Sequence, residues 1–298
     1  MSIININHLT KDYGNGKGVF NVSIQVNKGE VYGYLGPNGA GKSTTMRHLM
    51  GFSKPEKGTV TINGLDCWAD QKEIQKILGY LPGEIAFLDD MTGLQYLHLI
   101  ADMRGMKDFS KAEKILNLFE MNPNPVIKRM SKGMKQKIGI TAAFMHNPEI
   151  ILLDEPTSGL DPLMQKRFID LVLEEKSNGK TIILSSHIFE EVEKACDRIG
   201  IIRSGKLIKE ISMDELRNSM LKTYKIQFKT YQDLEKMKTK FIDAKFTESQ
   251  NEMTISINDK EINKLIKELS TCDLNSLKEE KHTLEEYFMQ FYGGDKNV

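Results

Sequence analysis

The residues best suited to chemistry form a loop from Gly36 to Ser43, which fits the pattern G-x-x-x-x-G-K-S/T at every fixed position. Glycines let the backbone turn its N–H groups inward around phosphate oxygens, and a helix after the loop adds the positive end of its dipole. In such a loop the Lys42 ammonium reaches the β- and γ-phosphates of a nucleotide, and the Ser43 hydroxyl binds Mg²⁺. The pattern predicts a nucleoside triphosphate site, without separating ATPases from GTPases or kinases.

Two consecutive acids, Asp154 and Glu155, form the second candidate group, at the end of an apolar run over residues 150–153. At the carboxyl edge of a parallel sheet such acids lie where ligands bind. Asp154 is suited to the Mg²⁺ shell, and Glu155 is placed to polarise a water for attack on the γ-phosphate. The pair therefore favours hydrolysis of the nucleotide.

The elements that must position these groups alternate between strand and helix. Val31–Leu35 is a buried-strand candidate that runs into the loop, and residues 45–51 form a helix candidate. The apolar runs 150–153 and 181–184 are strand-sized, with helical spacing between them at 165–176. This alternation predicts an α/β fold with a parallel sheet.

The pattern of apolar residues changes in two further parts of the sequence. Residues 92–145 have helical spacing, and we expect a helical subdomain over about 85–147 within a first domain of residues 1–211. Residues 212–298 predict a small two-layer α+β domain. Its expected elements are strands at 224–229 and 275–277, a hairpin at 246–257, and helices at 231–241, 260–270 and 283–292.

With both groups in hand, residues 3–209 resemble the nucleotide-binding subunit of an ABC transporter. Residues 130–137, MSKGMKQK, are similar to the signature loop, and residues 158–161, SGLD, to the D-loop. His187 resembles the switch histidine, and Tyr13 lies where the family places an aromatic ring on adenine. The resemblance implies the P-loop ABC ATPase fold, with a RecA-like parallel core, an antiparallel β subdomain and a helical subdomain.

The resemblance also implies the roles of individual residues, with ATP and Mg²⁺ as cofactors. Glu155, His187 and Lys42 would be catalytic, and Ser43 and Asp154 would hold Mg²⁺. Ser131, Gly133 and Asp161 would act across a dimer. The ATP-binding residues would be Tyr13, Val19, Asn38, Gly39, Ala40, Gly41, Lys42, Ser43 and Thr44.

Several of these residues have a plainer interpretation. Tyr13 is also compatible with an edge-strand aromatic, and His187 with a helix cap or a satisfied core histidine. Asp161 precedes Pro162 and is suited to capping a helix, as is Ser131. Both capping roles are compatible with the functional ones.

The chain departs from the family at two places. The common signature L-S-G-G-Q carries Met130, Lys132 and Met134 here, and similar S-K-G-M-K-Q loops occur in exporters of drugs and antimicrobial peptides. Gly83 stands where the family has a glutamine that contacts Mg²⁺ and water. Either Glu84 or a water molecule would take that place.

Composition limits the partners. Lys and Arg number 41, as do Asp and Glu, and no stretch approaches the roughly 20 apolar residues of a membrane span. We expect a cytoplasmic chain at the inner face of the membrane, with a second ATPase subunit (an identical chain or a related paralogue), a separate transmembrane permease and no nucleic acid. Residues 85–88 would dock the permease, although they are equally compatible with a core. The alternatives are a soluble ABC ATPase without a permease and a nucleotide-gated module with weak turnover.

Overall fold

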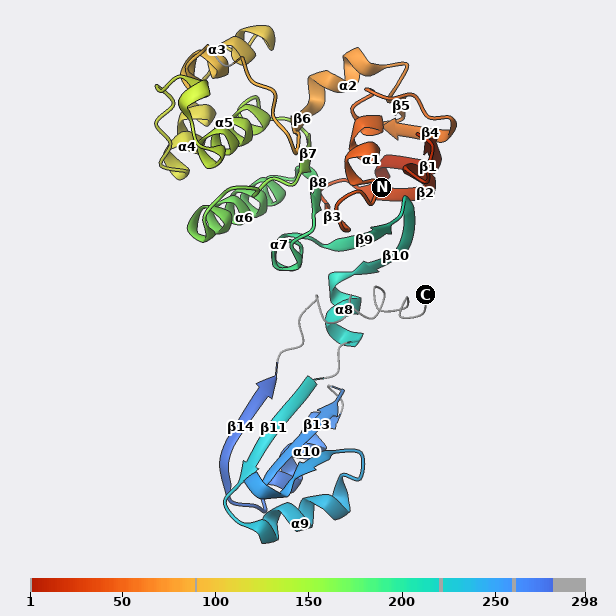
Figure 1. Ribbon diagram of the computed structural model, residues 1–298, viewed down its shortest axis with the longest axis vertical. Coiled ribbons are helices and arrows are strands. Elements are labelled where there is room, and N and C mark those ends of the chain that lie inside the picture. Colours follow the sequence, from red (N-terminus) through yellow and green to blue (C-terminus); the bar gives the residue numbers. More distant parts are fainter. Residues whose placement is uncertain (1, 89, 220–221, 259–260, 281–298) are drawn as a thin grey trace. The chain divides into compact units, whose positions relative to one another are not determined.

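The computed structural model describes residues 2–88, 90–219, 222–258 and 261–280 (Figure 1). The chain divides into two compact units, Met1–Ser212 and Met213–Val298. The helix expected at 283–292 lies outside the described residues.

A six-stranded sheet forms the centre of the first unit, in the order β10-β9-β3-β8-β7-β6. The strands from β9 to β6 are parallel, and β10 is antiparallel to β9. Every residue of β3, β7 and β8 is buried, as expected for parallel strands covered on both faces. The bounds are β3 Val31–Leu35, β6 Leu78–Leu81, β7 Ile150–Asp154, β8 Thr181–Ser186, β9 Arg198–Arg203 and β10 Lys206–Ser212.

A second, antiparallel sheet has the order β2-β1-β4-β5. Its strands are β1 Ser2–Asp12, β2 Gly18–Asn27, β4 Lys57–Ile62 and β5 Leu65–Asp66. Helix α1 (Lys42–Leu49) contacts both sheets, and Met46 and Leu49 share one hydrophobic core with side chains from each of them. The nucleotide loop is therefore fixed at one end to β3 and at the other to a buried helix.

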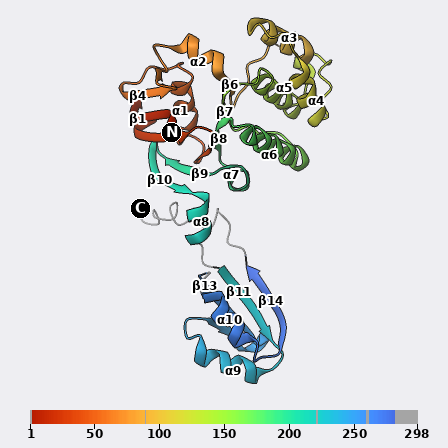
Figure 2. The ribbon, with the colours of Figure 1, turned by 180° about the vertical axis from the view of Figure 1, so that it is seen from behind.

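The helices of the first unit gather largely on the side of the parallel sheet opposite β1 and β2, as both views show (Figures 1 and 2). Helix α5 contacts α3, α4 and strand β6. The bounds are α2 Gln71–Ile77, α3 Gly93–Met103, α4 Ser110–Leu118, η1 Ile127–Arg129, α5 Lys132–Phe144, α6 Pro162–Ser177 and α7 Phe189–Ala195.

The second unit has a βαββαβ order and an antiparallel sheet in the order β12-β13-β11-β14, which is the ferredoxin-like arrangement. Alternate residues of β11 and β13 share a core with α9 and α10, so both helices cover one face of the sheet. The bounds are α8 Met213–Ser219, β11 Lys222–Phe228, α9 Tyr231–Lys240, β12 Lys245–Thr247, η2 Glu248–Gln250, β13 Glu252–Ile257, α10 Ile262–Leu269 and β14 Leu274–Glu280.

Candidate active site

The phosphate loop starts where β3 ends and closes where α1 begins. Gly41 is the N-cap of α1, with a left-handed φ of 111° and no side-chain cap. A Cβ atom at Gly41 would lie 2.9 Å from Val19 Cγ1, and one at Gly36 would lie 2.4 Å from the Ile202 carbonyl oxygen. Because neither position has room for a side chain, glycine allows the tight turn that leaves the first N–H groups of α1 open to an anion.

The residues predicted to bind ATP differ in their exposure. Val19 is fully buried against Gly41, so it supports the loop by packing. The Tyr13 ring follows β1 and is 52% exposed, which leaves surface for stacking on a base. Within the loop, Asn38, Gly39 and Ser43 are exposed, Gly41 and Thr44 are half-buried, and Ala40 and Lys42 are buried.

Lys42, Glu155 and His187 converge from the first residue of α1 and from the loops that follow β7 and β8. Lys42 Nζ donates to the Gly36 carbonyl at 2.6 Å and lies 3.0 Å from Glu155 Oε1. His187 Nδ1 donates to Glu155 Oε2 at 2.5 Å. Glu155 Oε1 is buried and is paired with the Lys42 ammonium, so each carboxylate oxygen of Glu155 faces one of the other two side chains.

Asp154 lies at the buried end of β7 and is 2% exposed. The Ser185 hydroxyl, on the paired strand β8, donates to Asp154 Oδ1. A Cβ atom at Gly83 would lie 3.4 Å from Oδ2, so the missing side chain leaves space beside that oxygen, while Glu84 is exposed. A carboxylate oxygen with adjacent room suits Mg²⁺, which keeps several water ligands in nucleotide sites.

The residues expected to act across a dimer form a separate group around the start of α5. Ser131 is the N-cap of α5 and accepts from the Met134 N–H at 3.2 Å. Asp161 caps α6 by accepting from the Met164 N–H at 3.0 Å. A Cβ atom at Gly133 would lie 2.7 Å from the Gly159 carbonyl oxygen, so the two loops approach each other closely. Both capping interpretations are therefore observed.

Comparison with known proteins identifies the family. Residues 19–158 match the family described as ABC transporter. The chain is 33% identical to the bacitracin transport ATP-binding protein BcrA of Bacillus licheniformis, over 98% of each chain. It is 32% identical to the protein of the same name from Enterococcus faecalis, over 98% of this chain and 97% of that one. The chain belongs to the ABC transporter ATP-binding proteins.

The fold agrees with this family. A solved dimeric structure of a bacterial ABC transporter cassette superimposes with a TM-score of 0.64 at 25% identity, covering 70% of this chain and 98% of that chain. The predicted P-loop ABC ATPase fold is confirmed, and the chain is an ATPase that binds its nucleotide through an ATP-binding cassette.

Sequence reasoning missed three side chains that hold the ABC site together. Ser185 fixes Asp154, and Gln136 Nε2 donates to the Pro156 carbonyl at 2.7 Å. Glu191 accepts from Thr157 and Ser186. The signal that these residues share is a polar side chain at a buried position of a helix or strand. Local spacing in the sequence does not reveal the partner of such a side chain.

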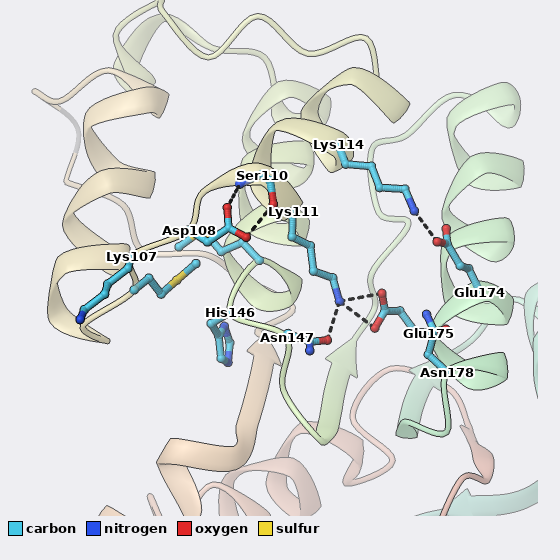
Figure 3. Close-up of a pocket in the computed structure, with 12 residues that line it drawn as sticks. Lys107, Asp108, Ser110, Lys111, Lys114, His146, Asn147, Glu174, Glu175 and Asn178 are labelled. Atoms are coloured by element: carbon cyan, nitrogen blue, oxygen red, sulfur yellow. Dashed lines mark hydrogen bonds and ion pairs between the residues drawn. The ribbon is translucent and has the colours of Figure 1, made fainter.

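A polar cleft of about 750 Å³ lies elsewhere in the cassette, between α4, the end of α5 and α6. Lys111 reaches from α4 to Glu175 on α6 at 2.8 Å and to Asn147 at 3.0 Å, as Figure 3 shows. Nearby, Lys114 pairs with Glu174. These contacts join the helical subdomain to the core of the unit.

Burial lowers the pKa of His146, in the same cleft, to about 4, with a further lowering by the Arg104 charge. His146 Nε2 bonds the Leu78 carbonyl at 2.9 Å. The imidazole is therefore neutral in the folded chain near pH 7.

Proposed function

We propose that the chain is the MgATP-hydrolysing motor subunit of an ABC exporter, working with a separate transmembrane permease. The observation that carries the catalytic part is the convergence of Lys42, Glu155 and His187 at the open N-terminus of α1. Phosphate binding and water activation would then take place within a few ångströms of each other.

In the proposed reaction a water attacks the γ-phosphorus of ATP and the bond to the β-phosphate oxygen breaks, which gives ADP and phosphate. The Glu155 carboxylate accepts a hydrogen bond from the water, and His187, oriented by Oε2, faces the γ-phosphate. Lys42 offsets the charge that develops on the phosphate oxygens. Mg²⁺, held by Ser43 and Asp154, would supply further charge stabilisation; the space beside Gly83 suits a water ligand, with exposed Glu84 as the alternative.

The active assembly would be a dimer around two MgATP, of identical chains or of this chain and a related paralogue. Ser131 and Gly133 of one subunit would contact the γ-phosphate held by the other, with Asp161 close to the same interface. The known dimeric cassette of the same fold supports this arrangement. ATP bound between subunits would hold them together, and hydrolysis would release them.

A groove of about 960 Å³ between α2, β6 and α3 is the candidate docking surface for the permease. It presents Phe52 and Met103, which are 62% and 76% exposed, among Lys and Arg side chains. Within the neighbouring segment 85–88, the half-buried Ile85 packs against Gly139, whereas Leu88 is exposed. Exposed apolar groups rimmed by charge are typical of protein interfaces.

The proposed cargo class is a drug or a peptide antibiotic, moved outward. Two full-length relatives are named as bacitracin transport proteins, which supports this class. No helix in the described part of the chain combines the length and apolar character that a membrane crossing requires. As the partner of a permease, the chain would lie at the cytoplasmic face of the membrane.

The test is a mild-detergent pull-down of a tagged Glu155→Gln chain from native membranes with MgATP, followed by mass spectrometry. A multi-span protein recovered in stoichiometric amount supports the motor function. Recovery of the chain alone, or of ribosomal or chromosomal proteins, would favour the alternative of an ABC ATPase without a permease. ATP turnover is also measured on the wild-type chain. Substantial turnover would argue against the nucleotide-gated module, and weak turnover would favour it.

A further inference from the structure

Glu191 is a buried carboxylate outside the groups that contact nucleotide in the proposed function. It lies in the first turn of α7 and is only 3% exposed. Its two oxygens serve two different loops: Oε1 accepts from the Thr157 hydroxyl, and Oε2 accepts from the Ser186 hydroxyl at 3.0 Å. Thr157 and Ser186 are themselves buried, so neither hydroxyl has water as an alternative partner.

The two loops are the ones that carry Glu155 and His187. Thr157 lies two residues after Glu155, in a turn where the Ser158 N–H bonds the Glu155 carbonyl at 3.2 Å. Ser186 directly precedes His187, and its hydroxyl also accepts from the Ile188 N–H at 2.9 Å. The backbone on both sides of His187 is thus tied to the same carboxylate.

We propose that Glu191 is a positioning residue that holds the Glu155 loop and the His187 loop in register, so that the two side chains meet at 2.5 Å. This inference rests on the catalytic roles proposed above for Glu155 and His187. The two loops are joined at their base by the Glu155 N–H bond to the Ser185 carbonyl at 3.0 Å, and the carboxylate adds a second link further along both loops. A small misplacement of a water-orienting pair is enough to cost turnover.

The main test variant is Glu191→Gln, which keeps the size of the side chain but offers only one oxygen, so one hydroxyl loses its acceptor. Thr157→Val and Ser186→Ala remove one arm of the bridge each. The matched control is Glu190→Gln, in the same helical turn, where the side chain is 74% exposed and pairs with Lys194.

We expect kcat of Glu191→Gln to fall about ten- to hundredfold, while KM and nucleotide affinity change less than about threefold. Each single-arm variant should give a smaller loss, and Glu190→Gln should match the wild type. The rates are measured per nucleotide-binding site, well below Tm, so that a fraction of unfolded chain does not count as lost chemistry. A kcat equal to that of Glu190→Gln, or equal losses in nucleotide affinity and kcat, would overturn the proposal.

A double-mutant cycle tests whether Glu191 acts through His187. In a His187→Ala background, Glu191→Gln should reduce the residual turnover by less than about twofold, because the contact that it maintains is already gone. If the double variant instead loses turnover by the product of the two single losses, Glu191 and His187 act independently and the inference is wrong. If Glu155→Gln and His187→Ala themselves keep full turnover, the proposed catalytic roles fail instead.

Discussion

At the scale of single residues, the site depends on Glu155, whose two oxygens face different partners. Oε2 accepts from His187, and Oε1 forms an ion pair with the Lys42 ammonium at 3.0 Å. An amide at this position would keep the shape of the side chain but lose much of the basicity that the proposed reaction requires for water activation.

We predict that Glu155→Gln keeps ATP binding, lowers turnover at least about a hundredfold and traps a dimer, because the ATP at the interface is no longer consumed. Phosphate release and size-exclusion chromatography with MgATP measure both effects. Glu149→Gln, at an exposed position just before β7, is the control. A wild-type rate for Glu155→Gln would make the catalytic assignment wrong.

His146 gives a prediction about pH. Its pKa is about 4 in the folded chain against an ordinary 6.5, so the unfolded chain binds a proton in this range and the folded chain does not. Stability should therefore fall as the pH drops from about 6.5 to about 4, by at most about 3 kcal/mol from this group. Denaturant unfolding of His146→Gln should show a flatter pH dependence across that window, and a slope equal to wild type would contradict it. His8→Asn, at an exposed strand position, is the control.

At the scale of elements, the sequence predicts what local patterns encode. The strand before the phosphate loop, the helix after it and the acids ending β7 follow from short-range spacing and agree with the structure. The bridge through Glu191 could not be predicted, because it depends on which strands pair and where α7 then packs. Gln136 is a similar case, since its partner Pro156 is twenty residues away. The remaining roles in nucleotide and dimer contacts stay predictions.

The ion pairs between helices α4 and α6 lead to a prediction about stability. Glu175→Ala would leave Lys111 without its nearly buried partner, and we expect a loss of about 1–3 kcal/mol in unfolding free energy. Glu174→Ala, whose side chain is 43% exposed, should cost less than about 1 kcal/mol. Chemical denaturation measures the unfolding free energy of both variants. Equal losses of unfolding free energy would show that burial of the Lys111 ion pair does not increase its contribution to stability.

At the scale of the whole molecule, each of the two units contains a hydrophobic core built from its own described residues. The core around α1 contains residues of the first unit, and the core around α9 and α10 contains residues of the second. Each unit thus buries its own apolar surface. The described site residues all lie in the first unit.

We predict that a chain of residues 1–212 keeps MgATP affinity within about threefold of the full chain, because the described site residues lie in the first unit. The same chain should lose coupled transport, on the hypothesis that the second unit senses or regulates the permease. The charged surface of α10 motivates this role. Nucleotide titration measures the affinity, and the resistance of cells to the exported drug or peptide antibiotic measures the transport. Unchanged transport by the truncated chain would remove the regulatory hypothesis.

The backbone of Glu155 has a φ of +49°, a left-handed conformation that glycine or asparagine adopts more readily than glutamate. A library screened for thermal resistance alone would therefore reward replacement of this side chain, and, with Glu155 in the catalytic role proposed above, its most stable members would lose turnover.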